Sequence, residues 1–245
     1  MTGKSIIAVS NVSKLFRIPH ERRVTIKDNV VNLFRSVEYE EFRALEDVNL
    51  NIREGEFLGV VGPNGSGKST LLKVMCGVYP PSSGSVDVRG TISPFLELGV
   101  GFNGELTARD NVFLYGAVLG IPRSRIQNRF GHIMEFAELE KFVDAKLKSF
   151  SSGMWMRLAF AVAIEVGADI FLFDEVLAVG DHHYRQKCLA VFEDFKLQGK
   201  TVVLVSHDLG TMRQFCTRCV YLSRGKIKAE GAPETVLSAY AADVA

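Results

Sequence analysis

The sequence predicts an α/β fold with a mainly parallel sheet and a helical lobe inserted at roughly residues 97–165. Three observations lead to this prediction. A strand-like run at 56–61 passes through a glycine-rich loop into a helical pattern, LLKVMCG. Two later runs, DIFLFDE (169–175) and TVVLVSHD (201–208), are almost continuously apolar, as expected of strands buried on both faces of a parallel sheet. Between them and the first strands, from about 107 to 167, the pattern is helical.

The remaining elements follow in chain order. Further strands are expected at 46–52, 85–89 and 91–96. Thr107 and Asp110 resemble a capping box, with Asp in place of Glu, and predict a helix start. Other helices are expected at 123–138, after Ser151, at 183–198 and at 233–243. We therefore expect a single domain over 1–245, whose core is formed by 1–96 and 166–245.

Residues 17–43 do not fit a minimal core of this kind. They separate the first strand from the second, and their apolar residues fall on one face of a possible amphipathic helix. These residues are Ile26, Val30, Leu33, Phe34 and Val37. Two interpretations stay open: a helix packed on its own domain, and a docking element for a partner.

The loop after the first buried strand has the pattern of a phosphate-binding P-loop, G-x-x-x-x-G-K-[ST]. Its glycines allow the backbone N–H groups to surround a phosphate, and the following helix adds its N-terminal dipole. Lys68 is expected to reach the β- and γ-phosphates of a nucleotide, and the Ser69 hydroxyl to bind Mg²⁺. The predicted nucleotide-binding residues here are Gly62, Pro63, Asn64, Gly65, Ser66, Gly67, Lys68, Ser69 and Thr70.

Two acidic residues end the apolar run FLFDE. Asp174 is expected at the carboxyl end of a buried strand. There it would supply the carboxylate that P-loop proteins need on a neighbouring strand to hold Mg²⁺. Glu175 follows directly and would reach past the metal towards a water in line with the γ-phosphate. This position predicts a general base.

His207 ends another buried strand, in VLVSHD. Because strand carboxyl ends meet at one edge of an α/β sheet, its imidazole is expected near the γ-phosphate and the attacking water.

These motifs, in the order GPNGSGKST, SSG before an arginine-containing helix, LFDE and SHD, resemble the ATPase subunit of ABC transporters. The resemblance covers nearly the whole chain. It implies the P-loop NTPase fold of ABC ATPases, with a RecA-like core, an N-terminal antiparallel β part and an inserted helical subdomain. It also implies ATP and Mg²⁺ as ligands and a head-to-tail homodimer, with each ATP held between one P-loop and the other subunit's signature motif.

The resemblance assigns further residues. Ser151, Ser152 and Gly153 match the signature motif, and Ser151 would contact the γ-phosphate bound by the partner. Asp181 matches the loop that crosses the dimer interface. Phe16, in SKLF, is the candidate for the aromatic ring that stacks on adenine, with Tyr39 and Phe42 as competitors.

Several positions depart from the usual family pattern. Ser152 and Met154 stand where Gly and Gln are usual, and the segment FLELGVGFNGELT lacks the glutamine that normally contacts Mg²⁺. Glu97 is taken as the metal ligand there, with Asn103 as the alternative. Together with DEVLAVGD and the insertion before the P-loop, these features resemble those of one branch of the ABC transporter family. Members of that branch export lipid-linked polysaccharides such as O-antigen, capsule and teichoic acid.

This branch implies an integral-membrane permease as partner, in two copies, and a lipid-linked glycan as cargo. The chain would then lie at the cytoplasmic face of the inner membrane as a peripheral protein, coupled through the helical lobe near 97–120. Because the chain ends soon after its last predicted helix, we expect no C-terminal carbohydrate-binding domain. The alternatives are an importer or drug-exporter ATPase and a soluble ABC ATPase acting on ribosomes or DNA.

Composition narrows these alternatives. The formal net charge is +1, which gives no general attraction to nucleic acid, and no apolar run approaches the roughly 20 residues of a membrane span. We therefore expect no nucleic-acid partner. Cys216 and Cys219 form a lone CxxC without a second pair, which favours reduced thiols over a zinc or redox site.

Overall fold

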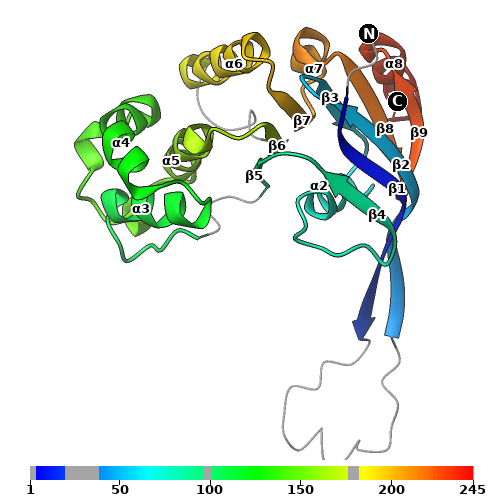
Figure 1. The fold of residues 1–245 in the computed structure, drawn as a ribbon, viewed down its shortest axis with the longest axis horizontal. Coiled ribbons are helices and arrows are strands. Elements are labelled where there is room, and N and C mark those ends of the chain that lie inside the picture. The colour runs from blue at the N-terminus through cyan, green and yellow to red at the C-terminus, as the bar shows by residue number, and fades with distance from the viewer. Residues whose placement is uncertain (1–3, 20–38, 97–100, 176–181, 245) are drawn as a thin grey trace, which may run out of the picture.

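The structure is a computed structural model that describes residues 4–19, 39–96, 101–175 and 182–244. Figure 1 shows two sheets with their helices on one side and a separate group of helices on the other. The separate group, called the helical lobe below, contains α3 (Ala108–Val118), α4 (Arg123–Ala137) and α5 (Ser152–Ala163). These helices lie inside the segment for which the sequence predicts an inserted lobe.

The larger sheet has six strands in the order β5-β6-β7-β3-β8-β9. Neighbouring strands are parallel except β8 and β9, which are antiparallel. The strands are β3 (Phe57–Val61), β5 (Ile92–Phe95), β6 (Ile170–Asp174), β7 (Thr201–Val205), β8 (Arg218–Ser223) and β9 (Lys226–Gly231). The predicted mainly parallel sheet is confirmed.

The smaller sheet is antiparallel, with the order β2-β1-β4. It is formed by β1 (Ser5–Pro19), β2 (Tyr39–Arg53) and β4 (Ser83–Val88). The strand expected at 46–52 is thus part of a much longer one, and the β1–β2 hairpin extends away from the body of the molecule (Figure 1). The apolar face predicted within 17–43 lies outside the described residues.

The core covers both faces of the larger sheet, which explains its continuously apolar strands. All five residues of β3 are buried. Phe57 and Val61 belong to the buried apolar cluster that includes α7 (Leu209–Phe215) and extends into the helical lobe, whereas Leu58 and Val60 belong to the cluster that includes α2 (Lys68–Met75) and the smaller sheet. Since alternate side chains of a strand point to opposite faces, a strand covered on both sides cannot show a polar face.

The remaining helices are α6 (His182–Leu197) and α8 (Pro233–Val244), and the short 3₁₀ turns are η1 (Glu140–Phe142), η2 (Leu147–Ser149) and η3 (Ile164–Val166). Thr107 is the N-cap of α3, and its hydroxyl accepts a hydrogen bond from the backbone N–H of Asp110 at 3.1 Å. The predicted cap is confirmed. Our sequence predictions did not include α7, β8 or β9.

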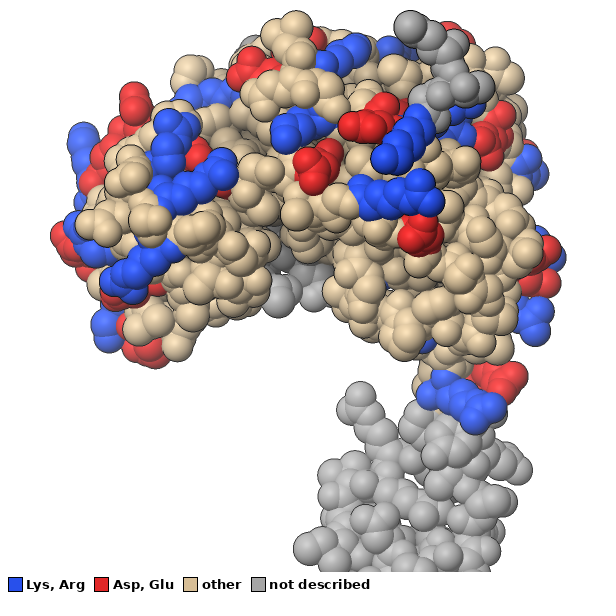
Figure 2. Space-filling view, in the orientation of Figure 1, with Lys and Arg blue, Asp and Glu red and all other residues tan. Residues whose placement is uncertain are grey.

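Charge is mixed over the surface in view (Figure 2), and the cysteines are not joined by disulfides. In Figure 2, acidic and basic side chains are mixed over the face in view. All four cysteines are free thiols, and within the described ranges no group of three His, Cys, Asp or Glu residues is arranged for a metal ion. None of the helices that the structure describes combines the length and apolar character required to cross a membrane.

Candidate functional site

The predicted chemical groups meet where three neighbouring strands end. β7 lies between β6 and β3 in the larger sheet. β3 leads into the P-loop, β6 ends at Asp174, and His207 follows β7. All three strands are parallel, so their carboxyl ends open on one edge of the sheet, the usual place for a ligand in this kind of fold.

The P-loop, residues 62–69, is folded around its own lysine. The Lys68 ammonium donates hydrogen bonds to the carbonyl oxygens of Gly62 at 2.8 Å and Pro63 at 3.0 Å. Burial lowers the pKa of Lys68, although Glu175 and Asp174 favour its charged form. The buried Ser66 hydroxyl has no hydrogen-bond partner among the described residues. Since buried polar atoms are normally paired, this loop has unused hydrogen-bonding capacity.

Gly67 is a glycine of this loop at which both the backbone conformation and the available space oppose a side chain. Its φ of 106° is left-handed, and a Cβ there would lie 2.5 Å from the Ala44 carbonyl oxygen. We expect Gly67→Ala to lower the free energy of unfolding by about 1–3 kcal/mol, measured by urea titration. Gly65→Ala is the matched control, because Gly65 also has positive φ but open space around it. Equal losses in the two variants would contradict the steric explanation.

Asp174 lies at the end of β6 beside the first turn of α2. It shares a side-chain hydrogen bond with Ser69. Burial raises the pKa of the Asp174 carboxyl, and Glu175 adds to this effect, while the Ser69 hydrogen bond and Lys68 oppose it. A hydroxyl and a carboxylate side by side are hard oxygen donors of the kind that Mg²⁺ prefers.

The raised pKa of Asp174 predicts a stability cost in the nucleotide-free chain. The folded state holds the proton more tightly than the unfolded state, so stability falls as pH rises from the unfolded pKa through the folded one. Asp174→Asn should therefore raise the urea midpoint at pH 7 in Mg²⁺-free buffer. This advantage should shrink as the pH is lowered into the acid range. An advantage that is independent of pH would contradict the ionic origin.

Glu175 and His207 contact each other. His207 Nε2 lies 2.8 Å from Glu175 Oε1, and both side chains are about half exposed. Glu175 has a left-handed φ of 55°, and its backbone N–H donates to the Val205 carbonyl at 2.9 Å. A left-handed non-glycine residue costs free energy, and such residues collect at functional sites. The two side chains predicted to handle water are thus brought together.

Ser151 lies in a different part of the molecule. It is the N-cap of α5, and its exposed hydroxyl accepts a hydrogen bond from the backbone N–H of Met154 at 3.2 Å. Ser152 and Gly153 form the first turn of α5. Within the described chain, no hydrogen bond or ion pair joins these residues to the P-loop. The signature segment, as we call residues 151–153, therefore does not complete this chain's own site in the structure.

Phe16 lies on β1 beside an aromatic residue that our sequence analysis missed. Its ring meets that of Tyr79 edge to face, with centroids 5.4 Å apart. The Lys14 ammonium lies over both rings and donates to the Pro80 carbonyl. Phe42, one competitor for Phe16, is its cross-strand partner and is about half exposed. No local signal could have found Tyr79, since the contact joins residues far apart in sequence.

Other predicted residues are only partly placed. Asn64 and Gly65 are exposed at the loop tip, and Thr70 lies in α2. Asp181, Glu97 and the side chain of Tyr39 lie outside the described residues. The Asn103 side chain accepts a hydrogen bond from the Glu105 backbone N–H at 2.9 Å, and its backbone N–H donates to the Asn111 side chain at 2.7 Å.

Comparison with known sequences places these motifs in context. A family model described as ABC transporter matches residues 45–178. An O-antigen export system ATP-binding protein of Klebsiella pneumoniae is 37% identical over 238 residues, covering 96% of this chain and 97% of the relative. A teichoic acids export ATP-binding protein of Listeria innocua is 37% identical over 241 residues, covering 97% of this chain and 70% of the relative.

One relative is much longer than this chain. An O-antigen export system ATP-binding protein of Myxococcus xanthus is 46% identical over 197 residues, which are 80% of this chain but 45% of that protein. Among solved structures, a dimeric ATP-binding cassette in a post-hydrolysis state bound to ADP and Pi is similar, with a TM-score of 0.75 and 27% identity. That match covers 93% of this chain and 98% of the cassette.

Proposed function

This chain belongs to the ABC transporter family, and from that premise we propose that it is the ATP-hydrolysing subunit of an exporter for a lipid-linked polysaccharide. The observation that carries the proposal is the sheet edge at which Lys68, Asp174 and the Glu175–His207 pair meet. Relatives named for O-antigen and teichoic acid export support the class of cargo.

ATP binds with its phosphates in the P-loop. The Lys68 ammonium exchanges its two carbonyl partners for the β- and γ-phosphate oxygens, and the negative charge of ATP offsets the cost of its burial. The backbone N–H groups and the N-terminal dipole of α2 add to the attraction. The unpaired Ser66 hydroxyl gains a partner at the same time.

Ser69 and Asp174 fit a Mg²⁺ ion bound with the nucleotide, because both are oxygen donors and already lie within hydrogen-bond reach of each other. When bound there, Mg²⁺ would neutralise part of the charge on the nucleotide phosphates and favour the ionised form of Asp174. Glu97 remains a proposed additional ligand.

Glu175 accepts a proton from the attacking water. His207 contacts both the γ-phosphate and the Glu175 carboxylate and keeps the two aligned. The contact at 2.8 Å supports this division of roles, because an imidazole that touches the base can also limit its rotation.

Two copies of the chain complete each other's sites. The signature segment begins α5 with an exposed hydroxyl and a helix N-terminus, both suited to a γ-phosphate bound by the partner. Asp181 lies in the loop that we expect to cross the interface. Hydrolysis removes the bridging phosphate and releases the closed dimer.

Adenine stacks on Phe16, which Tyr79 supports edge to face. We expect Tyr79→Ala to weaken ATP binding about 2- to 10-fold, the value of one aromatic pair. Tyr79→Phe should bind ATP as the parent does, because the ring contact is kept. Fluorescence titration with an ATP analogue measures the affinity of each variant. Equal affinity of Tyr79→Ala and the parent would show that Tyr79 does not contribute to the adenine site.

The chain docks on an integral-membrane permease at the cytoplasmic face of the inner membrane, with two chains on a permease dimer. The coupling surface is the helical lobe near 97–120, where Leu114 and Val118 on α3 are exposed apolar residues. The docking role of 17–43 remains an open proposal.

Reconstitution tests the proposed function. The chain, purified with its permease and placed in proteoliposomes, should hydrolyse ATP faster when a lipid-linked glycan is present. Lys68→Ala should abolish both basal and stimulated hydrolysis. Stimulation by a soluble solute with its binding protein, and none by a lipid-linked glycan, would refute the export proposal.

A further inference from the structure

An ionic cluster joins the helical lobe to α6 of the core. Its centre is Glu138, the C-cap of α4, whose φ of 60° is left-handed. Glu138 Oε2 accepts a hydrogen bond from Arg157 of α5 at 2.5 Å, and Oε1 accepts one from Lys187 of α6 at 3.0 Å. His183 Nε2 of α6 lies 3.4 Å from the same Oε1. One carboxylate thus faces three basic side chains from two other helices.

Aromatic and backbone contacts surround this cluster. The Arg157 guanidinium lies over the ring of Tyr184 on α6, 4.7 Å from its centroid, and the Tyr184 hydroxyl donates to the Arg157 carbonyl at 3.2 Å. Lys187 also donates to the carbonyl of Phe136 in α4 at 3.2 Å. Tyr184 is buried, and Arg157 is 18% exposed. The junction is therefore packed around Arg157 and Tyr184 and partly open to solvent at Glu138, Lys187 and His183.

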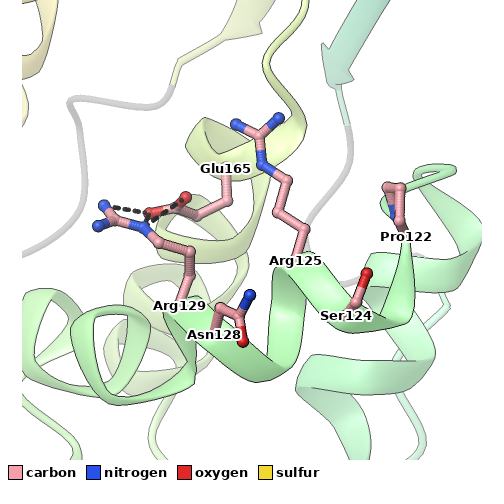
Figure 3. Close-up of a pocket in the computed structure, with 6 residues that line it drawn as sticks. All are labelled: Pro122, Ser124, Arg125, Asn128, Arg129 and Glu165. Carbon is pink, nitrogen blue, oxygen red and sulfur yellow. Dashed lines mark hydrogen bonds and ion pairs between the residues drawn. The ribbon is translucent and has the colours of Figure 1, made fainter.

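The middle of α4 is attached within the lobe by a second pair. The Arg129 guanidinium donates to both carboxylate oxygens of buried Glu165 in η3, and His132 lies 3.1 Å from one of them. Figure 3 shows this pair spanning from α4 to the end of α5. It borders a cleft of about 520 Å³, lined by Pro122, Ser124, Arg125, Asn128, Arg129 and Glu165. Because α4 and α5 are fastened together, Glu138 links both of them to α6.

Helix α5 carries the segment expected at the dimer interface. Arg157 lies six residues after Ser151 on α5, or about 9 Å along a helix. α6 begins at His182, which follows Asp181 directly in the sequence. The contacts of Glu138 therefore hold α5, which begins with the signature segment, against α6.

We propose that Glu138 is a positioning residue that holds the signature segment in the place that the shared ATP site requires. The inference rests on the proposed function, since it assumes that site. Removal of the carboxylate charge takes away the anion that Arg157 and Lys187 share, so the contacts between the lobe and α6 weaken and the two cations repel each other. ATP binding to one chain is unaffected, because Lys68 and Phe16 lie on the core.

The test measures ATP-driven dimerisation by analytical ultracentrifugation in a Glu175→Gln parent, in which bound ATP persists. Glu138→Gln keeps the side-chain length and loses the charge. We expect it to weaken dimerisation roughly 5- to 30-fold and to leave ATP affinity of the monomer unchanged. Asp144→Asn is the matched control, because its exposed pair with Arg109 lies on the same lobe away from α6. It should dimerise as the parent does.

Two further variants distinguish a loss of positioning, measured as dimerisation, from a loss of folding stability, measured as Tm. Lys187→Met added to Glu138→Gln removes one unbalanced cation and should restore part of the lost dimerisation. Glu138→Gly relieves the left-handed backbone, so its Tm should fall less than that of Glu138→Gln, yet it should dimerise as poorly as Glu138→Gln. A loss of Tm and of monomer ATP affinity that accounts for the dimer defect would overturn the inference.

The outcomes distinguish a failure of the proposed function from a failure of the positioning role alone. A Glu175→Gln parent that stays monomeric with ATP would overturn the shared site of the proposed function and this inference with it. A parent that dimerises equally well with and without Glu138→Gln would overturn the positioning role alone.

Discussion

Glu175→Gln should bind ATP normally but hydrolyse it about 10²–10⁴-fold more slowly, the usual contribution of a general base. The amide has nearly the same shape as the carboxylate and can keep a contact with His207, yet it cannot accept the proton of water. Bound ATP should then persist and hold two chains together. Phosphate release under single-turnover conditions measures the rate, and size-exclusion chromatography with ATP measures the dimer.

Asp208→Asn is a useful comparison for this variant. Asp208 lies beside His207 in sequence but caps α7, where its carboxylate accepts hydrogen bonds from Gly210 N–H and the Thr211 hydroxyl and pairs with Arg185. We expect a far smaller kinetic effect from this substitution, since Asp208 acts through the backbone of the helix. Wild-type turnover in Glu175→Gln would exclude Glu175 as the base.

Ser151→Arg should abolish hydrolysis, by at least about 10²-fold, while a single chain still binds ATP with unchanged affinity. The new side chain is large and lies at the N-terminus of α5, where the partner's γ-phosphate is expected, and the hydroxyl is lost. The P-loop of the same chain is not touched, so equilibrium binding at low protein concentration should not change.

Ser124→Arg provides the control for bulk and charge. Ser124 is an exposed serine on α4 of the same lobe, outside the signature segment. Its variant should hydrolyse ATP at the parental rate. Retained hydrolysis in Ser151→Arg would mean that α5 does not face nucleotide.

Local patterns predicted the parallel strands and the P-loop edge because each depends on residues close together in sequence. β6 and β7 are buried on both faces and so read as apolar runs, and each is followed directly by its polar residue, Asp174 or His207. β8 has an apolar centre of only four residues, too short to separate from a helical segment by periodicity. β9 is a half-exposed edge strand of six residues.

Features that arise from distant contacts could not be predicted. The support of Phe16 by Tyr79 depends on the approach of the loop after α2 to β1. The Glu138 cluster joins residues from three helices, and the left-handed backbone of Glu175 has no counterpart in a hydrophobic pattern. The length of the β1–β2 hairpin was also missed, since its outer residues are exposed and mixed in polarity.

A mixing experiment tests the central claim, that each ATP site is shared between two chains. Ser151→Arg and Glu175→Gln are each inactive, but in a mixed dimer one site combines the intact P-loop and Glu175 of one chain with the intact Ser151 of the other. Equal mixing should restore about a quarter of parental hydrolysis, since half of the dimers are mixed and each has one intact site of two. No activity above that of the separate variants would contradict the shared site.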